Sequence, residues 1–219
     1  MMDADQMRYE EPQRAISDAE ISDILGSIRL ERPSLFADAQ AVFTRFVDPR
    51  TLHDDGVMSP DVVAMNMLFA EWLFYDHELG MELSPLQLYS MAEPAVEEYA
   101  DTQFFSQFWV ISQNRRTGEV RLRDTRTCRN FDVIDKEIAC QRAWAHGLIG
   151  VRLAQVDGAW LTCGKFRPHD NCRSKPRPAS HGSLRDRGYD RLALLKLGAK
   201  VIGMDGEHRA SAAEFVATG

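Results

Sequence analysis

The sequence predicts an α+β protein in which an acidic helical part packs on a small antiparallel β-barrel and a short helical segment ends the chain. Apolar residues recur at helical spacing over residues 1–105, and short alternating strands follow over residues 106–167. The charge also changes sign along the chain. Residues 1–110 carry 21 Asp and Glu against 6 Arg, a net charge of −15, whereas residues 111–219 carry 12 acids against 20 bases, a net charge of +8. Such a division indicates two parts that have different partners or that attract each other.

Signals for helix starts divide residues 1–105 into four or five helices. Ser17 and Glu20 have the spacing of a capping box, and a second apolar stripe covers residues 34–47. Ser59-Pro60-Asp61 places an N-cap, a proline and an acid at the start of a third helix.

The end of this third helix and the start of the next are also marked in the sequence. We expect the third helix to run to about His77 or Leu79 and to stop near Gly80. Ser84-Pro85, with Gln87 at capping-box distance, starts a further helix that Pro94 should kink or split.

Between residues 106 and 167 the apolar period shortens to two, which is typical of half-buried strands. A hairpin turn is expected at Asp157-Gly158. The predicted strands are FWVIS, VRLRD, FDVID, IGVRLAQV and AWLTCGKF. Five short antiparallel strands predict a small barrel or a strongly curved sheet, SH3-like or OB-like in shape.

Two segments complete the chain. Residues 168–183 are rich in proline and basic residues and poor in apolar ones, so we expect a flexible basic linker there. Residues 184–219 should form a helical end, in which GYDRLALLKLG is a short amphipathic helix closed by Gly198.

The stretch FAEWLFYDHELG contains the candidate catalytic residues Glu71, Asp76 and His77. Met67, Leu68, Phe74 and Tyr75 lie three or four residues from Glu71, so its carboxylate should stand among apolar side chains. Burial there would raise its pKa and suit a general acid or base. The alternative is a structural carboxylate that joins this helix to a neighbour.

Asp76 and His77 are neighbours in the sequence and point about 100° apart on a helix, so they cannot act on one atom unless the chain has turned. A histidine in the last turn also interacts favourably with the helix dipole, which explains His77 without catalysis.

Cys163, His169, Cys172 and His181 supply four possible zinc ligands within a short segment. Their spacing, C-x5-H-x2-C-x8-H, fits none of the common zinc-finger or zinc-ribbon patterns, and Cys163 lies on a predicted strand from which it could face the core. A metal site here is therefore an alternative to reduced thiols.

An arginine cluster is the candidate site for an anion or nucleic acid. The cluster comprises Arg115, Arg116, Arg121, Arg123, Arg126 and Arg129. With Trp109, Trp144 or Trp160 nearby, these side chains could bind phosphates while a ring stacks on a base. The alternative is that the arginines attract the acidic half or form ordinary solvated surface.

The sequence lacks the motifs that identify several classes of enzyme and cofactor-binding protein. It contains no G-x-S-x-G, H-E-x-x-H or G-x-G-x-x-G motif and no phosphate-binding loop, so we expect no cofactor. The first residues lack a secretory signal. The longest uncharged apolar run, residues 62–70, is far shorter than the roughly 20 residues of a membrane span. These features predict a cytoplasmic protein with no membrane partner.

Residues 60–165 also resemble a group of uncharacterised bacterial proteins, some of which end in a SEC-C zinc motif. The resemblance rests on Phe69, Glu71, Trp72, Phe74, Asp76, Ser84-Pro85-Leu86, Tyr89, Gly147 and Arg152-Leu153. The C-x-C pair of the SEC-C ending is missing here, so no zinc tail is implied. The group implies no established activity and no catalytic residues.

These observations lead to three hypotheses of function. The first is a non-enzymatic binding or adaptor protein whose barrel and basic arm face a macromolecular partner, either a protein or a nucleic acid. The second is a small hydrolase or transferase that uses Glu71 with His77 or Asp76 in a cleft between the two halves. The third is a metal-stabilised module built on Cys163, His169, Cys172 and His181.

Overall fold

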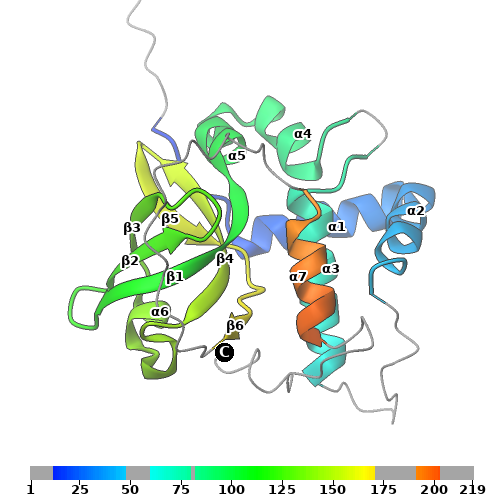
Figure 1. The fold of residues 1–219 in the computed structure, drawn as a ribbon. Helices are drawn as coiled ribbons and strands as arrows, with labels where there is room; N and C mark the ends of the chain where they lie inside the picture. The colour runs from blue at the N-terminus through cyan, green and yellow to red at the C-terminus, as the bar shows by residue number, and fades with distance from the viewer. Residues whose placement is uncertain (1–11, 48–59, 80–81, 171–190, 203–219) are drawn as a thin grey trace, which may run out of the picture.

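The computed structural model describes residues 12–47, 60–79, 82–170 and 191–202. Most of its helices lie on one side, and a curled antiparallel sheet lies on the other with one short helix beside it (Figure 1). The predicted α+β class is therefore confirmed, together with the curved sheet. The likeness of the sheet to an SH3 or OB fold stays a prediction.

The first two helices begin where the sequence places them. Helix α1 (Asp18–Glu31) follows the N-cap Ser17, and the capping box with Glu20 is formed. Helix α2 (Pro33–Phe43) starts with a proline, whose missing N–H is not needed in a first turn. The predicted stripe of residues 34–47 thus ends as a helix at Phe43 and continues as a turn.

Helix α3 (Pro60–Tyr75) is the central helix of the fold. Most of its residues are apolar, and although Asn66 is exposed, the side chains of residues 71–75 are all buried, which is typical of a helix end enclosed by its neighbours. It ends before the predicted His77 or Leu79, because the N–H groups of Asp76 and His77 both donate to the carbonyl of Trp72, at 2.9 and 3.0 Å. This arrangement closes the last turn and leads the chain away from the helix axis.

The segment after α3 contains a capped helix and the split expected at Pro94. Ser84 caps helix α4 (Pro85–Ala92) in a capping box with Gln87. Pro94 then begins a 3-10 turn, η2 (Pro94–Val96), which leads into helix α5 (Glu97–Thr102).

The five predicted strands are all present. They are β1 (Phe104–Asn114), β2 (Glu119–Asp124), β3 (Asn130–Ile134), β4 (Leu148–Val156) and β5 (Ala159–Cys163). Their order in the sheet is β3-β2-β1-β4-β5, and each neighbouring pair is antiparallel. A short helix, α6 (Lys136–Cys140), and a 3-10 turn, η3 (Arg142–Trp144), connect β3 to β4.

The sheet curls until its two outer strands share one aromatic cluster. The ring centroid of Phe131 on β3 lies 5.0 Å from that of Trp160 on β5, and Phe104 on β1 lies within 6 Å of both. These rings line the inside of the curl together with Phe108 and the buried Trp144. The sheet is a half-barrel whose interior is filled by apolar side chains.

The last two elements belong to segments with other predicted roles. Strand β6 (His169–Asp170) pairs with β4 at the start of the predicted linker, and residues 171–183 of that linker lie outside the described residues. Helix α7 (Ala193–Ile202) lies against α3 (Figure 1).

The prediction that Gly198 closes this last helix is wrong, since α7 continues through it to Ile202. A Cβ added at Gly198 would lie 2.4 Å from a methyl carbon of Leu68 on α3. The glycine therefore serves a close helix–helix approach.

Strand β4 contributes to two cores at once. Ile149, Val151 and Leu153 point into the half-barrel. Arg152 and Ala154 point to the opposite face, which the helices cover. The other face of the sheet is therefore not uniform: helices cover it over β4 and the start of β1, and the arginine-bearing β2 lies beyond them.

In the part of the chain that the structure describes, no helix combines the length and the apolar character needed to cross a membrane.

Candidate functional site

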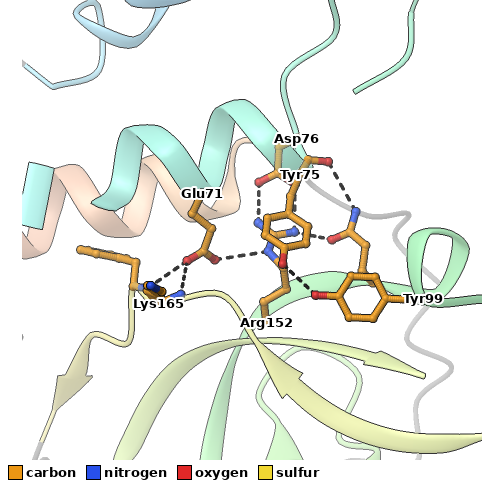
Figure 2. A network of polar contacts seen from close by, with 8 residues as sticks. Glu71, Tyr75, Asp76, Tyr99, Arg152 and Lys165 are labelled. Atoms are coloured by element: carbon orange, nitrogen blue, oxygen red, sulfur yellow. Dashed lines mark hydrogen bonds and ion pairs between the residues drawn. The ribbon is translucent and has the colours of Figure 1, made fainter. Parts of the chain in front are cut away.

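A buried arginine joins the helical half to the half-barrel. Arg152 of β4 is fully buried, and its guanidinium donates two hydrogen bonds to Asp76, to Oδ1 at 3.0 Å and to Oδ2 at 2.7 Å. The same guanidinium donates to Oε1 of Glu71 at 3.2 Å and to the side-chain oxygen of Gln103 (Figure 2). A charge enclosed in this way needs such partners, because burying it alone is very costly.

Glu71 of α3 is the second centre of this network. Its Oε2 accepts the backbone N–H groups of Lys165 and Phe166, each at 2.9 Å. The chain can approach so closely because Gly164 lacks a side chain, and a Cβ there would lie 2.5 Å from a Glu71 oxygen. Gly164 also has a φ of +73°, which favours glycine. Glu71 therefore holds the loop after β5 against α3.

Two tyrosines and a cysteine extend the network below Arg152. The guanidinium carbon of Arg152 lies 4.4 Å from the ring centroid of Tyr75, within cation–π range. The hydroxyls of Tyr75 and Tyr99 are 2.7 Å apart (Figure 2). Burial raises the pKa of the Cys163 thiol to about 12, although its hydrogen bond with Tyr99 acts in the opposite direction, so this thiol is protonated at neutral pH.

The acids of the network differ from ordinary surface carboxylates. Burial raises the pKa of Glu71, and the charge of Arg152 and the hydrogen bond from Phe166 act in the opposite direction. Glu71 and Asp76 are each 5% exposed. Both carboxylates are thus held by donors on the protein itself.

His77 lies apart from this pair. Its ring packs 4.4 Å from the ring of Trp72, and burial lowers its pKa. Of the three candidate catalytic residues, the structure brings Glu71 and Asp76 together at Arg152 and places His77 on the indole of Trp72. The hydrolase or transferase hypothesis stays a prediction.

The predicted metal ligands are only partly within the described residues. Cys163 is buried beside Tyr99, and the ring of His169 lies 5.4 Å from that of Trp144. Cys172 and His181 lie outside the described residues. Among the residues that are described, no three His, Cys, Asp or Glu side chains meet in a way that could hold a metal ion.

The arginine cluster lies along β2 and the turns at its two ends. Arg115, Arg116, Arg121 and Arg129 are exposed, and Arg123 and Arg126 are half-buried. Their interactions include contacts to Asp132, Asn130, the carbonyl of Cys140 and the ring of Phe131, which all belong to the half-barrel side. The arginines that do pair with the acidic half are outside the cluster: Arg152 pairs with Glu71 and Asp76, and Arg191 pairs with Glu78.

One tryptophan shares the face of the cluster. Trp109 lies between Phe108 and Val110, which point into the half-barrel, so its side chain points to the outer face. In the strand register Trp109 is opposite Arg123, and Arg123 is opposite Asn130, whose oxygen accepts from the guanidinium at 2.9 Å. Trp144 and Trp160 pack in the half-barrel core instead.

Glu119 of β2 and Asp132 of β3 share this face with the arginines. Glu119 is exposed and accepts from the side chains of Thr117 and Asn114. Asp124 is 1% exposed and holds the β2–β3 turn, where it accepts from Ser106 and from the backbone of Thr127. Asp132 pairs with Arg121 through two hydrogen bonds, and both side chains are more than half exposed. We define the basic face as Trp109, Arg115, Arg116, Arg121, Arg123, Arg126 and Arg129.

Sequence reasoning missed Arg152 as a site residue, although the resemblance rests partly on it. A usable signal was present, because Arg152 is the one charged residue in the strand LIGVRLAQV. A lone arginine in an apolar strand is rarely buried without an acidic partner.

Comparison with protein families, with curated proteins and with solved structures finds no match for this chain, so its function is argued from the geometry above.

Proposed function

We propose that the protein is a non-enzymatic binding or adaptor protein that holds single-stranded nucleic acid, or a similar polyanion, on the basic face. The observation that carries this proposal is the cross-strand row of Trp109, Arg123 and Asn130, with the exposed Arg121 on the same side of β2.

The row combines the two groups that single strands require. Guanidinium groups bind phosphates, and an indole offers a surface on which a base can stack whatever its sequence. Arg115 and Arg116 at one end of β2, with Arg126 and Arg129 at the other, extend the positive charge along a line about as long as the strand. A line of cations suits a chain of phosphates better than a single small anion.

The net charge of −7 does not oppose this proposal. The negative charge is concentrated in residues 1–110, and salt screens charges beyond a Debye length of about 8 Å at physiological ionic strength. A phosphate at the basic face therefore responds mainly to the arginines close to it.

The test measures binding of a fluorescein-labelled oligo(dT) of about 20 nucleotides by anisotropy between 50 and 200 mM NaCl. With about four phosphate contacts, the affinity should fall roughly 50-fold over this range. The double variant Arg115→Glu, Arg116→Glu should weaken binding at least tenfold at low salt. The matched control is Arg32→Glu, Arg45→Glu, which reverses two exposed arginines of the helical half and should bind as the wild type does.

Affinity that does not change with salt would reject the proposal, and so would equal losses in the two double variants. Trp109→Ala separates a nucleic acid from another polyanion. It should weaken oligo(dT) binding and leave binding of heparin, which has no bases to stack, unchanged.

A further inference from the structure

A cavity of about 640 Å³ lies where α1, α3 and β5 meet. A second cavity of about 310 Å³ adjoins it. Both volumes are in the range of small-molecule sites, which often lie between two parts of a protein. The residues that line both cavities are Asp18, Ile21, Met67, Tyr75, Gly164 and Lys165. None of them belongs to the basic face.

The walls of this joint cavity are apolar and its floor is polar. Ile21 of α1, Met67 of α3 and Leu161 of β5 line the walls. The hydroxyls of Tyr75 and Tyr99, 2.7 Å apart, lie at the floor with the protonated thiol of Cys163. Two carboxylates also line the cavities, Glu71 the smaller one and Glu137 the larger one, and each is paired with an arginine, Glu71 with Arg152 and Glu137 with Arg167.

Charged groups stand at the mouth. The Lys165 ammonium lies 3.0 Å from Asp18 Oδ2, and these side chains are 58% and 66% exposed. Exposed pairs of this kind are weak, so Lys165 can exchange Asp18 for an anion that arrives from solution. Arg167 also lines the larger cavity, but its guanidinium is already held by Asp135 at 2.8 Å and Glu137 at 3.0 Å. Lys165 is thus the cation placed to receive a ligand.

We propose that this cavity binds a small amphipathic organic acid, whose apolar body lies against Ile21, Met67 and Leu161 and whose carboxylate pairs with Lys165. The apolar walls explain the body of the ligand, and the position of Lys165 at the mouth explains its negative end. The ligand would touch Tyr75 and the loop at Gly164, which are the residues next to Arg152 and Glu71.

The first experiment measures binding of decanoate, and of decanol as its neutral analogue, by displacement of the fluorescent sulfonate 8-anilinonaphthalene-1-sulfonate. Met67→Trp fills both cavities with an indole and should weaken binding of both decanoate and decanol at least tenfold. Its matched control is Met91→Trp, since Met91 is 73% exposed and does not line either cavity. The control should bind both probes as the wild type does.

The second experiment tests the charge at the mouth. Lys165→Gln should weaken decanoate binding about fivefold, the size expected of one exposed ion pair, and should leave decanol binding unchanged. Lys136→Gln, at an exposed lysine outside the cavity, is the matched control and should change neither.

Three results would overturn the proposal. They are no displacement by decanoate at millimolar concentration, wild-type affinity in Met67→Trp, and equal loss of decanoate binding in Lys165→Gln and Lys136→Gln. Circular dichroism and thermal unfolding of each variant show whether a loss of binding reflects a loss of fold.

Discussion

Arg152 and Asp76, which are 76 residues apart in the sequence, meet in a two-point hydrogen bond where the half-barrel packs on the end of α3. Both side chains are buried, at 0% and 5% exposed. The planar fork of arginine matches the two carboxylate oxygens, a geometry that lysine cannot reproduce. This contact fixes the orientation of the central helix against the sheet.

Replacement of Arg152 should strongly destabilise the fold. Arg152→Met leaves the carboxylates of Glu71 and Asp76 buried without their cation, so the free energy of unfolding should fall by about 3–5 kcal/mol. Urea denaturation followed by circular dichroism measures this change. Arg121→Met breaks an exposed ion pair and serves as the control, with little expected effect. Equal stability of the two variants would contradict the structural role of Arg152.

The close approach of α7 and α3 predicts an unusual sign for a glycine substitution. Gly→Ala within a helix normally stabilises by up to about 1 kcal/mol. At Gly198 the added methyl would meet Leu68, so Gly198→Ala should destabilise by about 1–3 kcal/mol. Gly26→Ala in α1 is the control, because nothing lies within 4 Å of its Cβ position, and it should stabilise. Thermal unfolding of both variants tests the contrast, and stabilisation by Gly198→Ala would show that the helices are not so close.

Alanine substitutions at two glycines should distinguish the cost of a strained backbone from the cost of a steric clash. Gly158 and Gly164 have φ values of +72° and +73°, but only Gly164 has Glu71 against its Cβ position. Gly158→Ala should therefore cost about 1–2 kcal/mol for the left-handed backbone alone. Gly164→Ala should cost clearly more, since it also displaces the buried carboxylate. Chemical denaturation of the two variants measures the difference. Equal losses of unfolding free energy would mean that the Glu71 side chain can move aside at no energetic cost.

The capping box of α1 should make the free energy of unfolding depend on pH in the acidic range. The Arg14 guanidinium and the Ser17 hydroxyl lower the pKa of Glu20 from 4.5 to about 2. Because the folded-state pKa is lowered, Glu20 stabilises the protein above pH 4.5, and this contribution disappears as the pH falls towards 2. The difference in free energy of unfolding between wild type and Glu20→Gln should be largest above pH 5 and shrink in acid. A difference that does not change with pH would contradict this account.

The local features of the fold could be predicted because their signals lie within a few residues. The capping boxes at Ser17 and Ser84 and the alternation in β2 depend on neighbours in the sequence, and the structure contains all of them. The end of α7 could not be predicted in this way, because a glycine can close a helix or admit a neighbouring helix. Only the position of Leu68 decides between these two roles at Gly198.

The candidate site was harder to predict because its parts come from distant segments. Glu71 was expected to be buried, and it is, but its partners Arg152 and the amides of residues 165 and 166 are more than 80 residues away. The position of Trp109 on the outer face and of Trp144 and Trp160 inside also depends on the strand register. A list of residues that are close in sequence does not contain this information.

Strand β4 gives its odd-numbered side chains to one hydrophobic core and its even-numbered side chains to the other. Unfolding of either half alone would expose one apolar face of β4 to water. It would also remove part of the hydrophobic core against which the other half packs. The protein should consequently unfold in one cooperative calorimetric transition. In a fragment that carries the strands without the helices, the face of β4 that contains Arg152 and Ala154 would be exposed to water.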